Sequence, residues 1–267
     1  MAENKKMEAL KEKLIKMSKK DQERPWEVDK FSDDPRANEI INDIGKMPHV
    51  FVMACILGRQ YHDEMAWETM ARLEERIGTL DIKKLSRLTQ KDWETAFMKP
   101  THLHGFPHEI APFVMAAVQR IVNEYGGDAS RIWKGKPSSA TVIKRFLEFE
   151  GIGPMIAAMA TDILSRYFKV PLSDHCSIEI TVDERMKRVL SRMGIVDSEK
   201  PEYIQLTARE MYPKYPGIFD TVLWEIGKFH CFPVNPDCAT CPVDEWCFYS
   251  QEHRKGSGSE RRETIKA

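Results

Sequence analysis

Four cysteines near the end of the chain have the spacing of a metal-binding loop. They follow the pattern C-x6-C-x2-C-x5-C and are Cys231, Cys238, Cys241 and Cys247. Four thiolates from one short loop can converge on one metal centre. Structural zinc usually uses two C-x2-C pairs separated by a longer spacer, whereas this loop has one pair with a single cysteine on each side. The spacing favours an iron–sulfur cluster, with zinc or four free thiols as alternatives.

A second feature that could bind a ligand is the glycine turn in LEFEGIGPMIA (147–157). Gly151 and Gly153 permit a tight connection between two helices, because glycine adopts positive φ without a Cβ clash. Pro154 suits the first position of the second helix. Backbone N–H groups at such a helix start can hold a phosphate oxygen. An ordinary helix–helix connection would have the same residues.

Asp183 is a third candidate, because it directly precedes the helical pattern ERMKRVLSRM (184–193). Negative charge is stabilised at a helix start, so this aspartate suits either a structural N-cap or a reaction that needs a carboxylate. The basic residues of the same helix are candidates for phosphate contacts or for simple solvation. They are Arg185, Lys187, Arg188 and Arg192.

Most of the remaining chain has apolar residues at three- and four-residue steps, which predicts helices. Long alternating strand patterns and internal repeats are absent from the sequence. We therefore predict an all-α fold. The expected helices cover 50–60, 64–77, 110–125, 139–149, 155–168 and 184–193.

Composition limits the class of protein. The chain has 267 residues, 42% of them hydrophobic, and a formal net charge of −1. This length supports a real core, and the balanced charge argues against a polycationic wrapping protein. No apolar run reaches bilayer length and no secretory signal begins the chain. We expect a soluble cytoplasmic monomer that makes no membrane contact.

Three motifs follow one another along the chain in an order that resembles one known family. They are the glycine hairpin, ITVDERMKRV, and WEIGKFHC with the four-cysteine loop. The family is the endonuclease III branch of the helix-hairpin-helix (HhH-GPD) DNA glycosylases, and the similarity runs from about residue 38 to 249. The resemblance implies a two-lobed all-helical fold. A six-helix lobe at 48–172 would contain the hairpin, and 26–47 plus 173–250 would form an iron–sulfur lobe. A charged N-terminal arm (1–25) and a flexible tail (251–267) would flank them.

The resemblance also implies roles for particular residues. Asp183 falls on the catalytic aspartate, and Gly151 and Gly153 fall on the turn that grips DNA phosphate. Gln60 resembles the glutamine that fills the gap left by a flipped base, with Asp63 supporting that region. The four cysteines would hold a [4Fe–4S] cluster.

A histidine-rich loop, PTHLHGFPHE (100–109), lies where the family has a second DNA-probing loop. His104 is therefore a candidate DNA contact, and His102 and His108 are further candidates. A solvated loop is the alternative for each of these histidines.

The sequence departs from the family pattern in two informative places. Met155 stands where bifunctional members have a lysine, and a methionine cannot form a Schiff base. The stretch between Met155 and Asp183 is longer than the family pattern, with the extra residues expected in 169–179. The prediction is a monofunctional DNA glycosylase, with lyase activity from Lys144 or Lys187 as the alternative.

The expected partner is duplex DNA with a damaged or mismatched base, although the sequence does not identify that base. Two other functions are consistent with the residues. One is a non-catalytic DNA-structure-binding protein of the same fold, which the near-neutral pI of about 6.7 leaves open. The other is a zinc-stapled protein of unrelated purpose.

Overall fold

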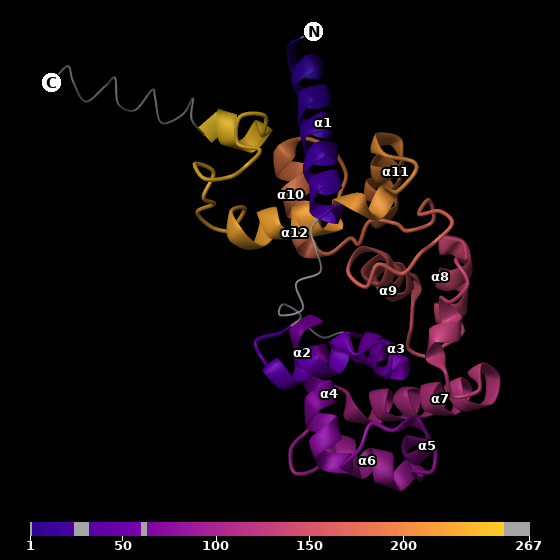
Figure 1. Ribbon diagram of the computed structural model, residues 1–267. Helices are drawn as coiled ribbons and strands as arrows, with labels where there is room; N and C mark the ends of the chain where they lie inside the picture. Colours follow the sequence, from indigo (N-terminus) through magenta and orange to yellow (C-terminus); the bar gives the residue numbers. More distant parts are fainter. Residues whose placement is uncertain (1, 24–31, 60–62, 254–267) are drawn as a thin grey trace, which may run out of the picture. The chain divides into compact units, whose positions relative to one another are not determined.

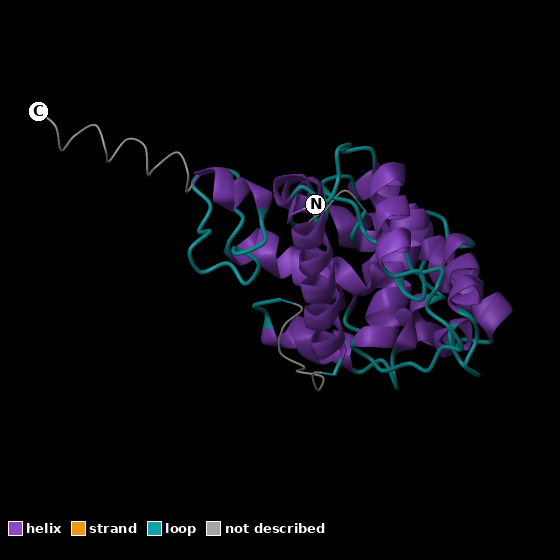
Figure 2. Ribbon diagram, turned by 90° about the horizontal axis from the view of Figure 1, so that it is seen from above, coloured by secondary structure: helices purple, strands orange, loops and turns teal. Residues whose placement is uncertain are grey.

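The computed structural model describes residues 2–23, 32–59 and 63–253, and the side chains of 5–23, 32–59 and 65–253. Helices and loops account for all of these ranges, and no strand occurs within them (Figure 2). The all-α prediction is confirmed. The helices divide into two compact units. We call Pro25–Asp174 the hairpin unit, and Met1–Arg24 with His175–Ala267 the cysteine unit.

The hairpin unit is built around one fully buried helix. Every residue of α3 (Pro48–Leu57) is buried, as expected for a helix that is apolar on all sides. Phe51 of α3 makes ring contacts with Trp67, Trp133 and Phe146. The surrounding helices are α2 (Pro35–Asn42), α4 (Asp63–Ile77), α5 (Ile82–Leu85), α6 (Gln90–Met98), α7 (Pro107–Tyr125), η1 (Ala129–Ile132), α8 (Ser139–Leu147) and α9 (Pro154–Arg166) (Figure 1).

Helix α2 belongs to the hairpin unit, whereas the sequence-based division placed 26–47 with the cysteine loop. Asp34 caps α2 by accepting hydrogen bonds from two backbone N–H groups. Arg36 of α2 then donates from Nε and Nη2 to the Glu74 carboxylate of α4, at 2.9 and 2.7 Å. Buried Ile40 and Ile41 complete the apolar face of the helix. These contacts fix α2 against α4.

The cysteine unit combines the beginning and the end of the chain. Helix α1 (Ala2–Gln22) packs against η2 (Pro216–Phe219) and α12 (Asp220–Phe229). The unit also contains α10 (Glu184–Met193) and α11 (Pro201–Met211) (Figure 1).

The charged N-terminal arm of the prediction is an ordered part of this unit. Leu10 and Leu14 of α1 are completely buried, and Lys13 lies over the Trp246 ring of the cysteine loop at 5.4 Å. The apolar residues Met7, Leu10, Leu14 and Met17 recur at helical spacing, and this stripe is sufficient for packing. Among the described helices, none has the length and apolar character that crossing a membrane requires.

Candidate functional site

The hairpin turn connects α8 to α9 and depends on Gly151. Its φ is +87°, and a Cβ there would lie 2.8 Å from Phe113 Cδ2 and 3.4 Å from Ile56 Cγ2. Backbone conformation and packing both exclude a larger residue. Gly153 differs, since it is the N-cap of α9 with φ −91° and its missing Cβ would face open space. The start of α9 is therefore accessible to a ligand.

Two apolar side chains flank the turn on its outer surface. Leu147 at the end of α8 and Met155 in the first turn of α9 are exposed, Met155 by 54%. Buried Phe146, Phe149 and Ile152 hold the turn from inside. The position that the resemblance assigns to a Schiff-base lysine thus carries an exposed thioether.

Asp183 is the N-cap of α10, as the sequence predicted. Its Oδ1 accepts a hydrogen bond of 2.6 Å from Met186 N, and the residue is exposed. The cap fixes the carboxylate against the first turn of α10 without enclosing it. A carboxylate held in this way is available to a bound molecule.

The first turn of α10 also contains Lys187, one of the two alternative lyase residues. Lys187 Nζ donates to Glu184 Oε1 at 2.5 Å, and this hydrogen bond raises the pKa of Lys187. The Lys187 amine is therefore engaged with a carboxylate of its own helix.

His104 is an internal support, which corrects its predicted place among the DNA contacts. Only 2% of the residue is exposed. Nε2 lies 3.2 Å from Leu57 O, and Nδ1 accepts a hydrogen bond from Phe106 N at 3.0 Å. Burial lowers the pKa of His104, so the ring is neutral at pH 7. His102 and His108, in contrast, are exposed.

Phe106 is the prominent residue of this loop. The sequence made it a candidate for lining a base pocket, with core packing as the default, and its exposure argues against core packing. The Phe106 residue is 50% exposed. It directly precedes Pro107, the first residue of α7. The loop beneath it is anchored by Arg76, which donates to Ala96 O and Thr101 O at 2.8 and 2.7 Å. An aromatic side chain on a fixed loop suits contact with nucleic-acid bases. Gln60 lies outside the described residues, as does the side chain of Asp63.

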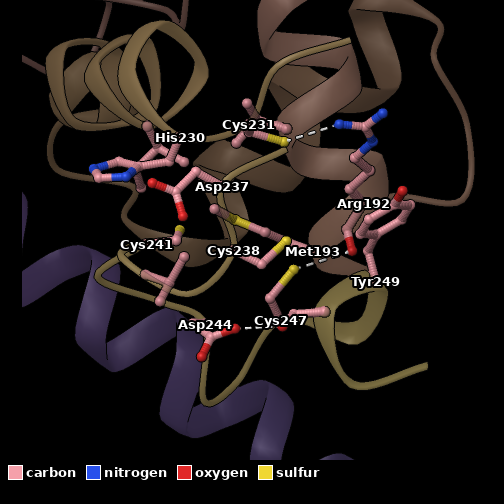
Figure 3. Close-up of a pocket in the computed structure, with 14 residues that line it drawn as sticks. Arg192, Met193, His230, Cys231, Asp237, Cys238, Cys241, Asp244, Cys247 and Tyr249 are labelled. Atoms are coloured by element: carbon pink, nitrogen blue, oxygen red, sulfur yellow. Dashed lines mark hydrogen bonds between the residues drawn. The ribbon is translucent and has the colours of Figure 1, made fainter. Parts of the chain in front are cut away.

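The four predicted cysteines line one hollow in the cysteine unit (Figure 3). Apolar residues form much of the remaining wall: Val189, Met193, Ile226 and Val243.

The four thiols surround a space and do not meet at a point. Among the described residues, no three or more His, Cys, Asp or Glu side chains are close enough to hold a metal ion. Burial raises the pKa of Cys241 to about 11, and also raises the pKa of Cys238 and Cys247. As free thiols these groups are neutral at pH 7, and a cationic centre would displace their protons. Four thiol donors from one loop are the ligand type of iron–sulfur clusters and of structural zinc sites.

Two arginines of α10 fix the cysteine loop, so their side chains are committed to the protein instead of to phosphate. Arg192 donates to Phe232 O and Pro233 O at 2.6 and 2.8 Å, and its Nη1 lies 3.5 Å from Cys231 Sγ (Figure 3). Arg188 Nε donates to Cys231 O at 2.9 Å. These contacts tie the first cysteine to the helix that begins beside Asp183.

No family model matches the chain, but individual proteins are similar to it in sequence. Endonuclease III of Thermotoga maritima is 26% identical over 190 residues, which cover 68% of this chain and 78% of that protein. Adenine DNA glycosylase of Schizosaccharomyces pombe is 33% identical over 108 residues, which cover 38% of this chain and 21% of that protein. The similarity to the second protein concerns a small part of its length.

Solved structures extend the likeness to nearly the whole fold. The structure of a thermostable thymine-DNA glycosylase matches with a TM-score of 0.58 and 16% identity, and covers 94% of this chain and 100% of that one. A non-covalent endonuclease III–DNA complex matches with a TM-score of 0.55 and 19% identity, over 82% of this chain and 95% of that one. The chain is thus similar in sequence to endonuclease III and shares its fold with these solved structures.

The chain has no regular secondary structure between α9 and α10, where extra residues were expected at 169–179. Within the hairpin unit, Ser173 N donates to Pro137 O at 2.9 Å, and Ser139 Oγ donates to Asp174 at 2.6 Å. Within the cysteine unit, Ile178 O accepts a hydrogen bond from Gly217 N at 2.8 Å. Both ends of the segment are thus attached to their own units.

Proposed function

We propose that this protein is a DNA N-glycosylase of base excision repair, acting on duplex DNA with a damaged or mispaired base. One observation carries the proposal: Asp183, which the sequence resemblance assigns to the catalytic aspartate, is an exposed carboxylate that caps α10. The fold around it is shared with endonuclease III and thymine-DNA glycosylase structures. An N-glycosidic bond breaks through an oxocarbenium-like sugar. A fixed carboxylate stabilises that cation and orients water toward it.

In this reaction the electron pair of the C1′–N bond leaves with the base, which takes up a proton. Water adds to C1′ and loses its proton to Asp183 or to solvent. Asp183 Oδ1 accepts a hydrogen bond from Met186 N, which leaves the second carboxylate oxygen to interact with the sugar or the water. The base must first leave the stack, and exposed Phe106 is suited to support the opened duplex.

We propose that the reaction is monofunctional, with water as the nucleophile. Met155, at the position that the resemblance assigns to the Schiff-base lysine, has no amine and cannot form an imine with the sugar. Hydrolysis therefore leaves an intact strand with an abasic site.

We propose that Cys231, Cys238, Cys241 and Cys247 hold a [4Fe–4S] cluster. A bound cluster would cross-link the two ends of the cysteine loop and supply four thiolate–iron bonds to the stability of the unit. Arg188 and Arg192 would connect this brace to α10 through their bonds to the loop backbone. The reaction at Asp183 uses no electron transfer.

The test is a panel of labelled duplexes carrying deaminated, oxidised, alkylated and mismatched bases. The parent protein should release at least one base, and the strand should break only after alkali. Asp183→Asn should lower the single-turnover rate at least about 100-fold, since it removes the charge that stabilises the sugar cation. Strand breakage without alkali, through a borohydride-trapped adduct, would disprove the monofunctional assignment.

Full retention of every activity in Asp183→Asn, with unchanged binding to DNA, would instead favour a non-catalytic DNA-structure-binding protein.

A further inference from the structure

The segment that leads into Asp183 is attached to the start of α12 by a carboxylate. Asp220, the first residue of α12, accepts two hydrogen bonds from Thr181, one from its backbone N and one from its Oγ1, both of 2.9 Å. Thr181 lies two residues before Asp183 but 39 positions before Asp220 in the chain. Fixing both groups of Thr181 restricts the backbone immediately before the N-cap.

A second contact holds the same segment slightly earlier. Gly217 of η2 donates from its backbone N to Ile178 O at 2.8 Å. A Cβ on Gly217 would lie 2.8 Å from Ile178 Cγ2 and 3.1 Å from Ile178 O. The close approach of η2 therefore leaves residues 178–181 bound along the η2–α12 junction.

A third contact fixes the chain two residues after Asp183. The stem of Arg185 crosses α12 so closely at Gly227 that a Cβ there would overlap Arg185 Cγ and Cδ. The Arg185 guanidinium then lies over the Trp224 ring, with Cζ 5.3 Å from the centroid. Asp183 is thus at the middle of a short stretch that α12 holds on both sides.

We propose that Asp220 is a positioning residue for Asp183, acting through Thr181. This inference rests on the proposed glycosylase function. The cap bond from Met186 N sets the carboxylate relative to α10, and Asp220 sets the preceding backbone relative to α12. Together they limit the carboxylate to one orientation, which matters because small displacements at a reacting centre lower rates strongly.

The experiment compares Thr181→Val, which removes only the hydroxyl donor, with Thr181→Ser, which keeps it. Thr181→Val should lower the single-turnover excision rate about tenfold. Its affinity for a duplex with a neutral tetrahydrofuran abasic site should stay within about twofold of the parent. Thr181→Ser should restore the rate to within about threefold. Asp220→Asn added to Thr181→Val should slow the reaction less than the product of the two single effects, because both act on one contact.

A second readout does not depend on knowing the target base. A duplex with a protonated pyrrolidine abasic site resembles the sugar cation, so a correctly placed Asp183 should bind it more tightly than the tetrahydrofuran duplex. The ratio of the two affinities should fall about tenfold in Thr181→Val and remain near the parent value in Thr181→Ser.

The outcomes separate the two proposals. If Thr181→Val keeps the parent rate and affinity ratio while its melting temperature falls, the contact is only structural and the inference is overturned. If the parent excises no base but its affinity ratio depends on Thr181, the excision proposal fails and the positioning inference stands. A parent that neither excises nor prefers the cationic duplex overturns both.

Discussion

The two glycines of the hairpin turn have different backbone conformations and different packing environments. Gly151 needs a positive φ and has Phe113 against its Cα, whereas Gly153 has an ordinary φ and open space. The sequence motif G-I-G makes them look equivalent. Only the packed structure separates a residue required for folding from one that leaves the start of α9 open.

Gly151→Ala should therefore destabilise the protein by about 2–3 kcal/mol, since a left-handed non-glycine residue costs about 1–2 kcal/mol and the contact with Phe113 adds to it. Gly153→Ala is the matched control and should change stability little. Urea unfolding of both variants measures this. Equal losses would show that the turn does not distinguish the two positions.

Two buried histidines should make stability depend on pH. Burial lowers the pKa of His49, which lies 2.7 Å from Leu80 O, and of His104. A histidine whose pKa is lower in the folded state binds protons more readily when unfolded. Its contribution is complete above the unfolded pKa of about 6.5 and decreases as pH falls below that value.

The urea midpoint should therefore fall between about pH 6.5 and pH 5. His104→Gln should reduce this dependence, and His108→Gln, at an exposed position, should not. A midpoint that is constant across this range would contradict the expected protonation states.

At the scale of elements, periodicity located six of the described α-helices, because each of these buries an apolar face. They are α3, α4, α7, α8, α9 and α10. The Asp183 cap and the four-cysteine loop followed from residue type and spacing. The environments of individual side chains could not be predicted from the sequence, because they depend on contacts between distant segments. His104 and exposed Phe106 are two residues apart with opposite environments, and Asp220 meets Thr181 only through folding. Helix α1 was underestimated because its charges outnumber its apolar residues.

Helix α1 should contribute measurably to the cysteine unit. Leu14→Ala removes a completely buried side chain and should cost about 2–5 kcal/mol. Lys16→Ala, at an exposed position of the same helix, is the control and should cost little. Hydrogen exchange of α12 amides reports this effect, and unchanged protection in Leu14→Ala would mean that α1 does not stabilise α12.

At the scale of the whole molecule, the fold joins two kinds of support: a hydrophobic core around α3 and a thiol-lined hollow beside α10. The second kind is expected to depend on a bound inorganic group, because hollow space among neutral thiols provides few favourable contacts. Stability of the cysteine unit should therefore follow its metal content.

The purified protein should contain about four iron and four sulfide ions per chain and absorb broadly near ~400 nm. Cys238→Ser should lose most of this absorbance and unfold the cysteine unit at lower urea. Cys176→Ser, at an exposed cysteine outside the hollow, should retain it. Stoichiometric zinc without iron would contradict the cluster assignment.

The packing of α1 on α12 has a consequence for how the protein is made. Helix α1 is synthesised almost 200 residues before its partner α12. During that interval the apolar stripe of α1 has no native surface to cover it, while the hairpin unit can already fold. The cysteine unit can therefore be completed only after α12 has been synthesised, and until then the apolar face of α1 is exposed on the nascent chain.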